Sequence, residues 1–176
     1  MKVVEGMSPM MRHYMEVKEQ YPDCFLFYRL GDFYEMFFED AVEGSRIMEL
    51  TLTGRDCGLK ERAPMCGVPY HSVDTYVQKL ISKGYKVAIC EQMEDPALAK
   101  GLVQRSVTRV ITPGTVIEEK LLDAGKNNYL MSVYYTDSGI GYAYADVSTG
   151  IFFTGELSEN GGEDALLNEL GRIAPS

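Results

Sequence analysis

The segment GDFYEMF (31–37) places an aromatic ring, Phe33, and a carboxylate, Glu35, two positions apart. If the backbone is extended here, alternate side chains share a face, so Phe33 and Glu35 point outward together and Tyr34 points to the core. A flat ring beside a carboxylate suits a heteroaromatic base, because the ring can stack while the carboxylate bonds to the base edge. A carboxylate repels phosphates, so the pair would read a base rather than a backbone.

The pattern of the same residues by itself favours a structural interpretation. Asp32 and Glu35 have the spacing of a capping box, in which Glu35 bonds back to the first amide of a helix. Phe33 would then pack at the margin of the apolar face. A helix from about Asp32 to Met48 fits the periodicity, with one face formed by Tyr34, Phe37, Phe38, Ala41, Ser45 and Met48.

The elements around this segment alternate between helices and strands. Ser8-Pro9 is typical of a helix start, and Pro22 would end that helix. A further helix is predicted after Ser72, with Gly84 at its end. Apolar runs predict strands over residues 24–29, 50–54, 85–92 and 105–112, with a loop over 54–72. Residues 1–115 are therefore predicted to form one α/β domain with a mixed sheet.

The pattern changes after a polar linker over residues 116–128. Three runs, YLMSVYYTD, IGYAYADV and IFFTGEL, alternate apolar and polar residues and are separated by turn sequences. They predict an antiparallel meander, followed by a helix over EDALLNELGRI. Three strands and one helix bury little core, so residues 129–176 are predicted to begin a larger domain, and the chain is predicted to be a fragment.

Composition narrows the function classes. No apolar stretch approaches the roughly 20 residues of a membrane span, and no secretory signal is apparent. The four cysteines form no C-x-x-C pair and only two histidines occur, which argues against zinc and favours free thiols in a reducing compartment. The net charge is −9, but residues 51–110 carry nine basic and six acidic side chains. This middle segment could touch a phosphate backbone without holding DNA by charge alone.

Four segments, in order, resemble the MutS family of DNA mismatch repair proteins. GDFYEMFFEDA (31–41) is similar to the family's mismatch-recognition segment, whose hallmark is Phe-x-Glu. The stretches MRHYMEVKEQYPDCFLFYRLGDFYE, PMCGVPYHSVDTYVQKLISKGYKVAICEQMEDP and RSVTRVITPGT resemble its N-terminal domain. NNYLMSVYYTD through DVSTGIFF resembles the first strands of its RNase H-like connector domain. The resemblance covers about residues 8–176.

The resemblance implies roles for individual residues. Phe33 would insert into the minor groove and stack on a mispaired or unpaired base, Glu35 would hydrogen-bond that base, and the DNA would be kinked. Whether Glu35 acts protonated on a purine N7 or ionised on a pyrimidine N–H stays open. Arg55 and Arg105 match basic positions that contact DNA. Met65 and Tyr70 lie on a loop that approaches the minor groove, although loop packing explains them nearly as well.

The resemblance also implies what the whole protein needs. The chain has no G-x-x-x-x-G-K-[ST] motif, so we expect it to be no enzyme and to bind no cofactor itself. A full-length protein of the family would use ATP and magnesium, form a homodimer and meet a MutL-type partner. It would act on mismatched double-stranded DNA in the bacterial cytoplasm, at the nucleoid and away from membranes.

Two other function classes compete with DNA recognition. A metal-dependent nuclease would use carboxylates near the meander, such as Asp137, Asp146 and Glu156, converging on magnesium. A protein-interaction module without a DNA-reading role would instead use Phe33 as part of an apolar docking patch. The nuclease alternative predicts magnesium-dependent nicking of DNA. The protein-interaction alternative predicts that replacement of Phe33 leaves DNA binding unchanged.

Overall fold

The computed structural model describes residues 6–94, 101–123, 125–158 and 162–176. The chain forms two compact units, Met1–Ile111 and Thr112–Ser176. The first unit ends at Ile111, slightly before the domain end predicted at residue 115. The reason is that the 3-10 turn η2 (Pro113–Thr115) is hydrogen-bonded within the second unit. There the Asn128 side-chain amide donates to the Pro113 carbonyl at 2.8 Å. The two units are described separately below.

The first unit is built on a mixed six-stranded sheet, as predicted, with strand order β3-β4-β2-β1-β5-β6. Strands β1 and β5 are parallel, and the other neighbouring pairs in this sheet are antiparallel. The strands are β1 (Cys24–Leu30), β2 (Phe33–Phe37), β3 (Thr53–Arg55), β4 (Ala63–Pro69), β5 (Lys86–Gln92) and β6 (Arg105–Ile111). Strand β2 is therefore bonded along both edges, between β1 and β4.

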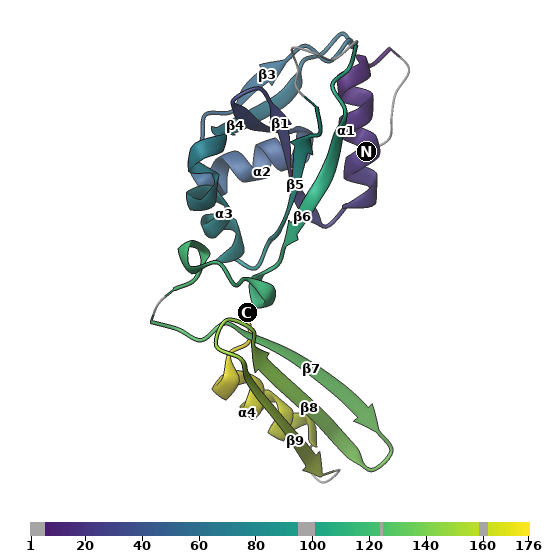
Figure 1. Ribbon diagram of the computed structural model, residues 1–176. Coiled ribbons are helices and arrows are strands. Elements are labelled where there is room, and N and C mark those ends of the chain that lie inside the picture. Colours follow the sequence, from purple (N-terminus) through teal and green to yellow (C-terminus); the bar gives the residue numbers. More distant parts are fainter. Residues whose placement is uncertain (1–5, 95–100, 124, 159–161) are drawn as a thin grey trace. The chain divides into compact units, whose positions relative to one another are not determined.

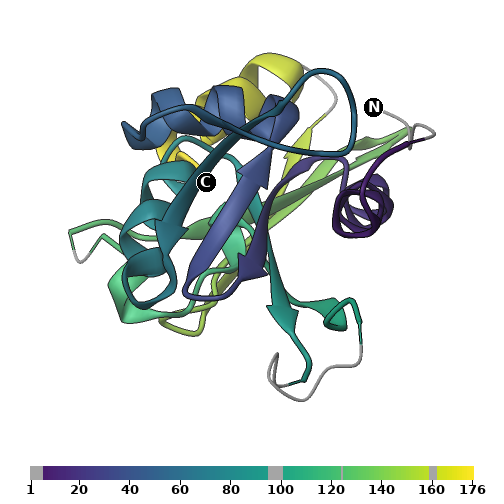
Figure 2. The same cartoon turned by 90° about the horizontal axis from the view of Figure 1, so that it is seen from above.

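Helices cover both faces of this sheet (Figure 1). Helix α1 (Pro9–Gln20) packs on one face, where Met11, Tyr14 and Leu26 belong to one buried cluster. Helices α2 (Phe38–Met48) and α3 (Val73–Ile81) lie on the other side of the strands. Figure 2 shows α1, in purple, nearly end-on and separated from the blue α2 by strands. The unit is thus a three-layer sandwich with a central sheet.

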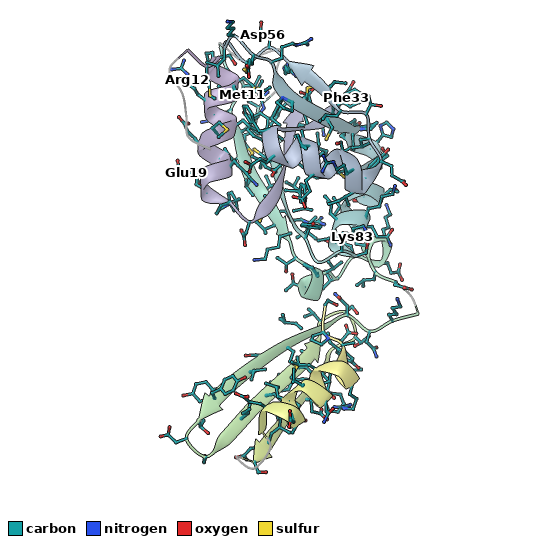
Figure 3. The ribbon with its side chains drawn as sticks, turned by 180° about the vertical axis from the view of Figure 1, so that it is seen from behind. Met11, Arg12, Glu19, Phe33, Asp56 and Lys83 are labelled. Carbon is teal, nitrogen blue, oxygen red and sulfur yellow. The ribbon has the colours of Figure 1, made fainter. Side chains whose placement is uncertain are left out.

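Helix α1 begins as the sequence predicts. Ser8 is its N-cap residue and accepts a hydrogen bond from the Met11 amide at 3.4 Å, and Pro9 occupies the first position. Met11 lies on the side that faces the sheet and Arg12 on the outer side (Figure 3). An N-cap acceptor and an N1 proline satisfy or remove amides that a helix start leaves unpaired.

The predicted start of the second helix is wrong. Residues Phe33–Phe37 form strand β2, and the helix begins only at Phe38, so the Asp32–Glu35 capping box does not form. Leu30 pairs with Phe33 across a two-residue turn, Gly31-Asp32, and Gly31 has a φ of 58°. Glycine at this turn position favours a tight hairpin, and pairing on both edges outweighs the helical periodicity.

The predicted loop over residues 54–72 is also wrong in part, because it contains β4. Backbone pairing with β2 and β3 gives this Gly- and Pro-rich segment a strand that its composition does not favour. The strand predicted over 50–54 is shorter and later, at Thr53–Arg55. Ser72 does precede α3, but its hydroxyl donates to the Pro69 carbonyl at 3.2 Å and does not cap the helix.

The second unit contains the predicted antiparallel meander, in the order β7-β8-β9. Its elements are β7 (Tyr129–Thr136), β8 (Gly139–Asp146), β9 (Ile151–Ser158), helix α4 (Gly162–Ile173), η2 and the short turn η3 (Glu119–Leu121). Helix α4 packs on one sheet face, where the Tyr142 hydroxyl donates to Glu169 at 3.3 Å. Within the ranges that the structure describes, no helix is long and apolar enough to cross a membrane.

Candidate nucleic-acid interface

Phe33 is the exposed aromatic residue that opens β2. Its backbone pairs with Leu30 on one side and Pro69 on the other, yet its side chain is 47% exposed. Figure 3 shows it at the margin of the first unit. The next residue, Tyr34, is only 5% exposed, as the extended conformation predicts. Phe33 is therefore a ring held out to solvent on a strand fixed along both edges.

Glu35 follows on the same face of β2, opposite Gly67 of β4. A Cβ atom built at Gly67 would lie 3.3 Å from the Glu35 Cγ atom and 3.2 Å from the Tyr34 carbonyl oxygen. Both distances are shorter than ordinary carbon and oxygen contacts, so the missing side chain at Gly67 leaves room for Glu35 to lie across β4. The Glu35 side chain is 15% exposed as a result.

Arg55, at the end of the edge strand β3, is the partner of Glu35. Its Nη1 atom donates to Glu35 Oε2, and the Arg55 side chain is 39% exposed. The sequence interpretation names both residues but gives no reason for them to meet. Strand order brings them together, because β4 alone separates β3 from β2.

Tyr70 is anchored beside the turn that carries Phe33. Its amide donates to the Asp32 carbonyl at 2.9 Å, and its ring is 45% exposed. The Arg29 guanidinium carbon lies 3.9 Å from the centre of the Tyr70 ring, a cation–π contact. Arg29 belongs to β1 and pairs with Tyr34, so this contact lies on the sheet face opposite to Glu35.

Arg105 does not join this group, whereas Met65 lies on the same sheet face as Glu35, between the β4 residues that pair with Glu35 and Arg55. Met65 is partly buried against the core cluster beneath α1. Arg105 is 8% exposed, and its guanidinium donates to the carbonyls of Arg29 at 2.8 Å and Val103 at 2.7 Å. The same group lies 5.1 Å from the centre of the Tyr28 ring. Phe33, Glu35, Arg55 and Met65 therefore share one face of the sheet. Tyr70 lies beside the turn and contacts Arg29 on the other face, and Arg105 stabilises strand ends.

A buried polar network fixes the junction between β2 and α2, next to the candidate site. The Tyr14 hydroxyl accepts from the Phe37 amide at 3.2 Å, and its oxygen lies 3.5 Å from Asp40 Oδ2. Asp40 accepts from the Leu26 amide at 2.9 Å and pairs with Lys18 at 2.9 Å. Helix α1, strand β1 and helix α2 are therefore tied to the strand that carries Phe33 and Glu35.

The carboxylates considered for a nuclease are not brought together. The Asp146 side chain accepts from the Ser148 hydroxyl at 2.6 Å and from the Asn128 amide at 3.1 Å. These bonds stabilise a turn, and the Ser148 hydrogen bond lowers the pKa of Asp146 below its ordinary value. Glu156 pairs with Gly141, which lies five residues before Asp146 on β8. Because side chains alternate between faces along a strand, Glu156 lies on the sheet face opposite to Asp146. Across the described ranges, no three acidic, histidine or cysteine side chains are grouped to hold a metal.

Sequence reasoning missed Arg29 and Gly67. Gly67 had a signal, since a glycine inside a strand often marks the close approach of another group. The Gly31-Asp32 pair between two apolar runs was likewise a hairpin signal. No feature of the sequence pointed to Arg29, because its contact with Tyr70 depends on strand pairing between distant segments.

The chain is similar in sequence to protein families and to individual proteins that are already known. Residues 8–120 match the family MutS domain I, and residues 128–176 match MutS domain II. The DNA mismatch repair protein MutS of Acetivibrio thermocellus is 59% identical over 171 residues, which cover 97% of this chain and 20% of that protein. The proteins of the same name from Alkaliphilus metalliredigens and Ruminiclostridium cellulolyticum are 58% and 59% identical, over 97% and 96% of this chain and 19% of each relative. The chain thus spans about a fifth of the length of these relatives. Two consecutive domain matches and this identity over nearly every residue show that the chain belongs to the MutS family.

Proposed function

We propose that the first unit recognises mispaired or unpaired bases in double-stranded DNA. Phe33 enters the minor groove and stacks on the defective base, and Glu35 hydrogen-bonds the same base. The observation that carries the proposal is the exposed Phe33 ring on a strand paired along both edges, with a carboxylate two residues further on the same face. The names of the relatives, DNA mismatch repair proteins, support the same substrate class.

The physical basis of discrimination lies in the DNA as well as in the protein. Opening a base step costs a few kcal/mol, and the cost is smaller at a mismatch, where stacking is already weak. Stacking a base on an aromatic ring returns roughly 1–3 kcal/mol. A rigid strand strengthens this exchange, because Phe33 needs no rearrangement to present its ring. One ring can then serve many different defects.

Charge contributes less to this binding than is usual for DNA-binding proteins. The chain has a net charge of −9, and its most basic segment, residues 51–110, carries an excess of only three positive side chains. Neutralised phosphates supply most nonspecific affinity, so the chain by itself should bind DNA weakly. The test therefore uses a full-length relative in which this chain replaces the matching 171 residues of the Acetivibrio thermocellus protein.

Fluorescence anisotropy at low salt tests the proposal. The dissociation constants of the full-length chimera are compared for a duplex with one unpaired thymine and for the perfect duplex. We expect Phe33→Ala to reduce the preference for the defective duplex by about fivefold or more, because about 1–3 kcal/mol of stacking is lost. Weak binding to the perfect duplex should persist.

The control variant is Tyr134→Ala, which removes an exposed aromatic ring from β7 of the second unit. It should leave the preference unchanged. An undiminished preference in Phe33→Ala would contradict the proposal and favour a protein-interaction role for this surface. Magnesium-dependent nicking that disappears in Asp146→Asn would instead revive the nuclease hypothesis.

For the whole protein we propose the remaining family properties that the sequence resemblance implies. These are ATP and magnesium use outside the present residues, a homodimer, a MutL-type partner and a cytoplasmic location at the nucleoid. Membership of the family supports them. ATP hydrolysis by the full-length protein that contains these residues, but not by this chain alone, is the direct measurement.

A further inference from the structure

The Glu35 carboxylate is already engaged before any DNA is present. Its Oε2 atom accepts from Arg55 Nη1, and the pair joins the central strand β2 to the edge strand β3. Glu35 contributes the better-buried side chain, 15% exposed against 39% for Arg55. A partly buried pair is screened by salt less than two freely exposed charges. The contact can therefore hold the carboxylate in place under the conditions in which DNA is bound.

Two features make this contact relevant to base recognition. A lone carboxylate beside Phe33 would repel the phosphates on both sides of the minor groove, and Arg55 compensates that charge. A carboxylate also has two oxygens, so occupation of Oε2 leaves Oε1 for a second hydrogen bond. Gly67 also matters sterically. Because it has no side chain, it leaves open the space through which the Glu35 side chain crosses β4.

We propose that Arg55 is a positioning residue for base recognition: it holds the Glu35 carboxylate beside Phe33 through Oε2 and leaves Oε1 to bond the base. The inference rests on the proposed function and deepens it. It differs from the direct DNA contact that the family resemblance implies for Arg55, which for a basic side chain would be made most simply to a phosphate. A phosphate contact would strengthen binding to any duplex, whereas a positioning residue strengthens only the reading of the defect.

A double-mutant cycle separates these two roles, because a residue that acts through Glu35 has no effect once Glu35 is absent. The full-length chimera is prepared as wild type, Arg55→Gln, Glu35→Ala and the double variant. For each protein the ratio of dissociation constants for the perfect duplex and the unpaired-thymine duplex is measured by anisotropy at several salt concentrations.

We expect Arg55→Gln to lower this ratio about three- to tenfold when Glu35 is present, and less than about twofold in the Glu35→Ala background. The slope of log affinity against log salt should stay unchanged when Glu35 is present. Equal weakening of both duplexes in both backgrounds, with the slope reduced by about one, would overturn the proposal and make Arg55 a phosphate contact.

The matched control is Arg62→Gln, which removes the same charge from an exposed residue directly before β4. It should leave the ratio unchanged, and a loss equal to that of Arg55→Gln would overturn the proposal. If Arg55→Gln lowers the melting temperature of the chain, Arg55→Met, which also removes the charge but keeps an apolar stem, takes its place in the cycle with the same two outcomes. Failure of the proposed function is recognised separately, because the wild-type chimera would then show no preference or keep it in Phe33→Ala.

Discussion

Arg55 and Arg105 are basic residues on strands of one sheet, yet their surroundings differ. Arg55 sits on the edge strand β3 and pairs with a carboxylate. Arg105 is buried at the start of β6, with a cation–π contact to Tyr28 and two backbone carbonyls as acceptors. A guanidinium whose donors already meet carbonyls has fewer left for a phosphate. The two arginines should therefore respond differently to substitution.

Arg105→Met should destabilise the chain by about 1–3 kcal/mol, because it leaves the carbonyls of Arg29 and Val103 without their donors. The apolar stem of methionine keeps most of the packing. Urea unfolding followed by circular dichroism measures the change. Full stability combined with a loss of DNA affinity in the chimera would instead support the direct DNA contact that the family resemblance implies.

At the scale of elements, the junction of β2 and α2 controls where the candidate site lies. Phe38 has a φ of 56°, a left-handed conformation that is costly for a bulky residue. The surrounding contacts hold it there. Tyr14 packs edge-on against the Phe37 ring at 4.9 Å between ring centres, and its hydroxyl accepts from the Phe37 amide. Asp40 ties the first turn of α2 to β1 and to Lys18 of α1.

Asp40→Ala should lower the free energy of unfolding by about 3 kcal/mol, since the Leu26 amide and Lys18 both lose their buried acceptor. Asp40→Asn keeps an oxygen for the Leu26 amide and should cost less. Urea unfolding of both variants measures the difference. Equal stability of Asp40→Ala and wild type would show that the network does not hold the junction.

The same carboxyl predicts a pH dependence. Burial raises the pKa of Asp40 above its ordinary value of 3.8, although Lys18 opposes the shift. The folded chain therefore binds this proton more tightly than the unfolded chain. The resulting stabilisation is fully present below pH 3.8 and is lost as the pH rises through the raised pKa. The stability of wild type relative to Asp40→Asn should thus decrease from pH 3.5 to pH 7 in a series of urea titrations.

At the scale of the whole molecule, the two units differ in their chemistry. Cys24, Cys57, Cys66 and Cys90 are all buried, and all lie in the first unit. Burial raises the pKa of Cys66 to about 12 and that of Cys90 to about 11. The reactive thiolate is therefore scarce at neutral pH as well as inaccessible. Thiol reactivity reports the first unit alone.

We expect all four thiols of the folded chain to react with a maleimide at pH 7 at least about a hundredfold more slowly than in denaturant. The rate of labelling should follow the unfolding of the first unit and should not depend on the unfolding of the second unit. Mass spectrometry of timed, quenched samples counts the labels. Rapid modification of Cys66 in native buffer would contradict the buried position in β4.

The sequence alone determined the features that depend on neighbours along the chain. Ser8 and Pro9 set the start of α1, and the alternating runs after residue 128 specified the antiparallel meander. The ordered segments around Phe33 and Glu35 were enough to point to the family. Helix caps, strand alternation and motif order are properties of the sequence, so they can be recognised without knowledge of the tertiary structure.

The tertiary structure decided whether residues 33–37 are helix or strand. Their periodicity and the Asp32–Glu35 spacing favour a helix, but β1 and β4 supply hydrogen-bond partners on both sides and make the segment a strand. Only that pairing exposes Phe33 while burying Tyr34. The meeting of Glu35 with Arg55, and the burial of Arg105, likewise depend on strand order. Long-range backbone pairing chooses between conformations that local propensity leaves nearly equal, and here it also sets which charged side chains meet.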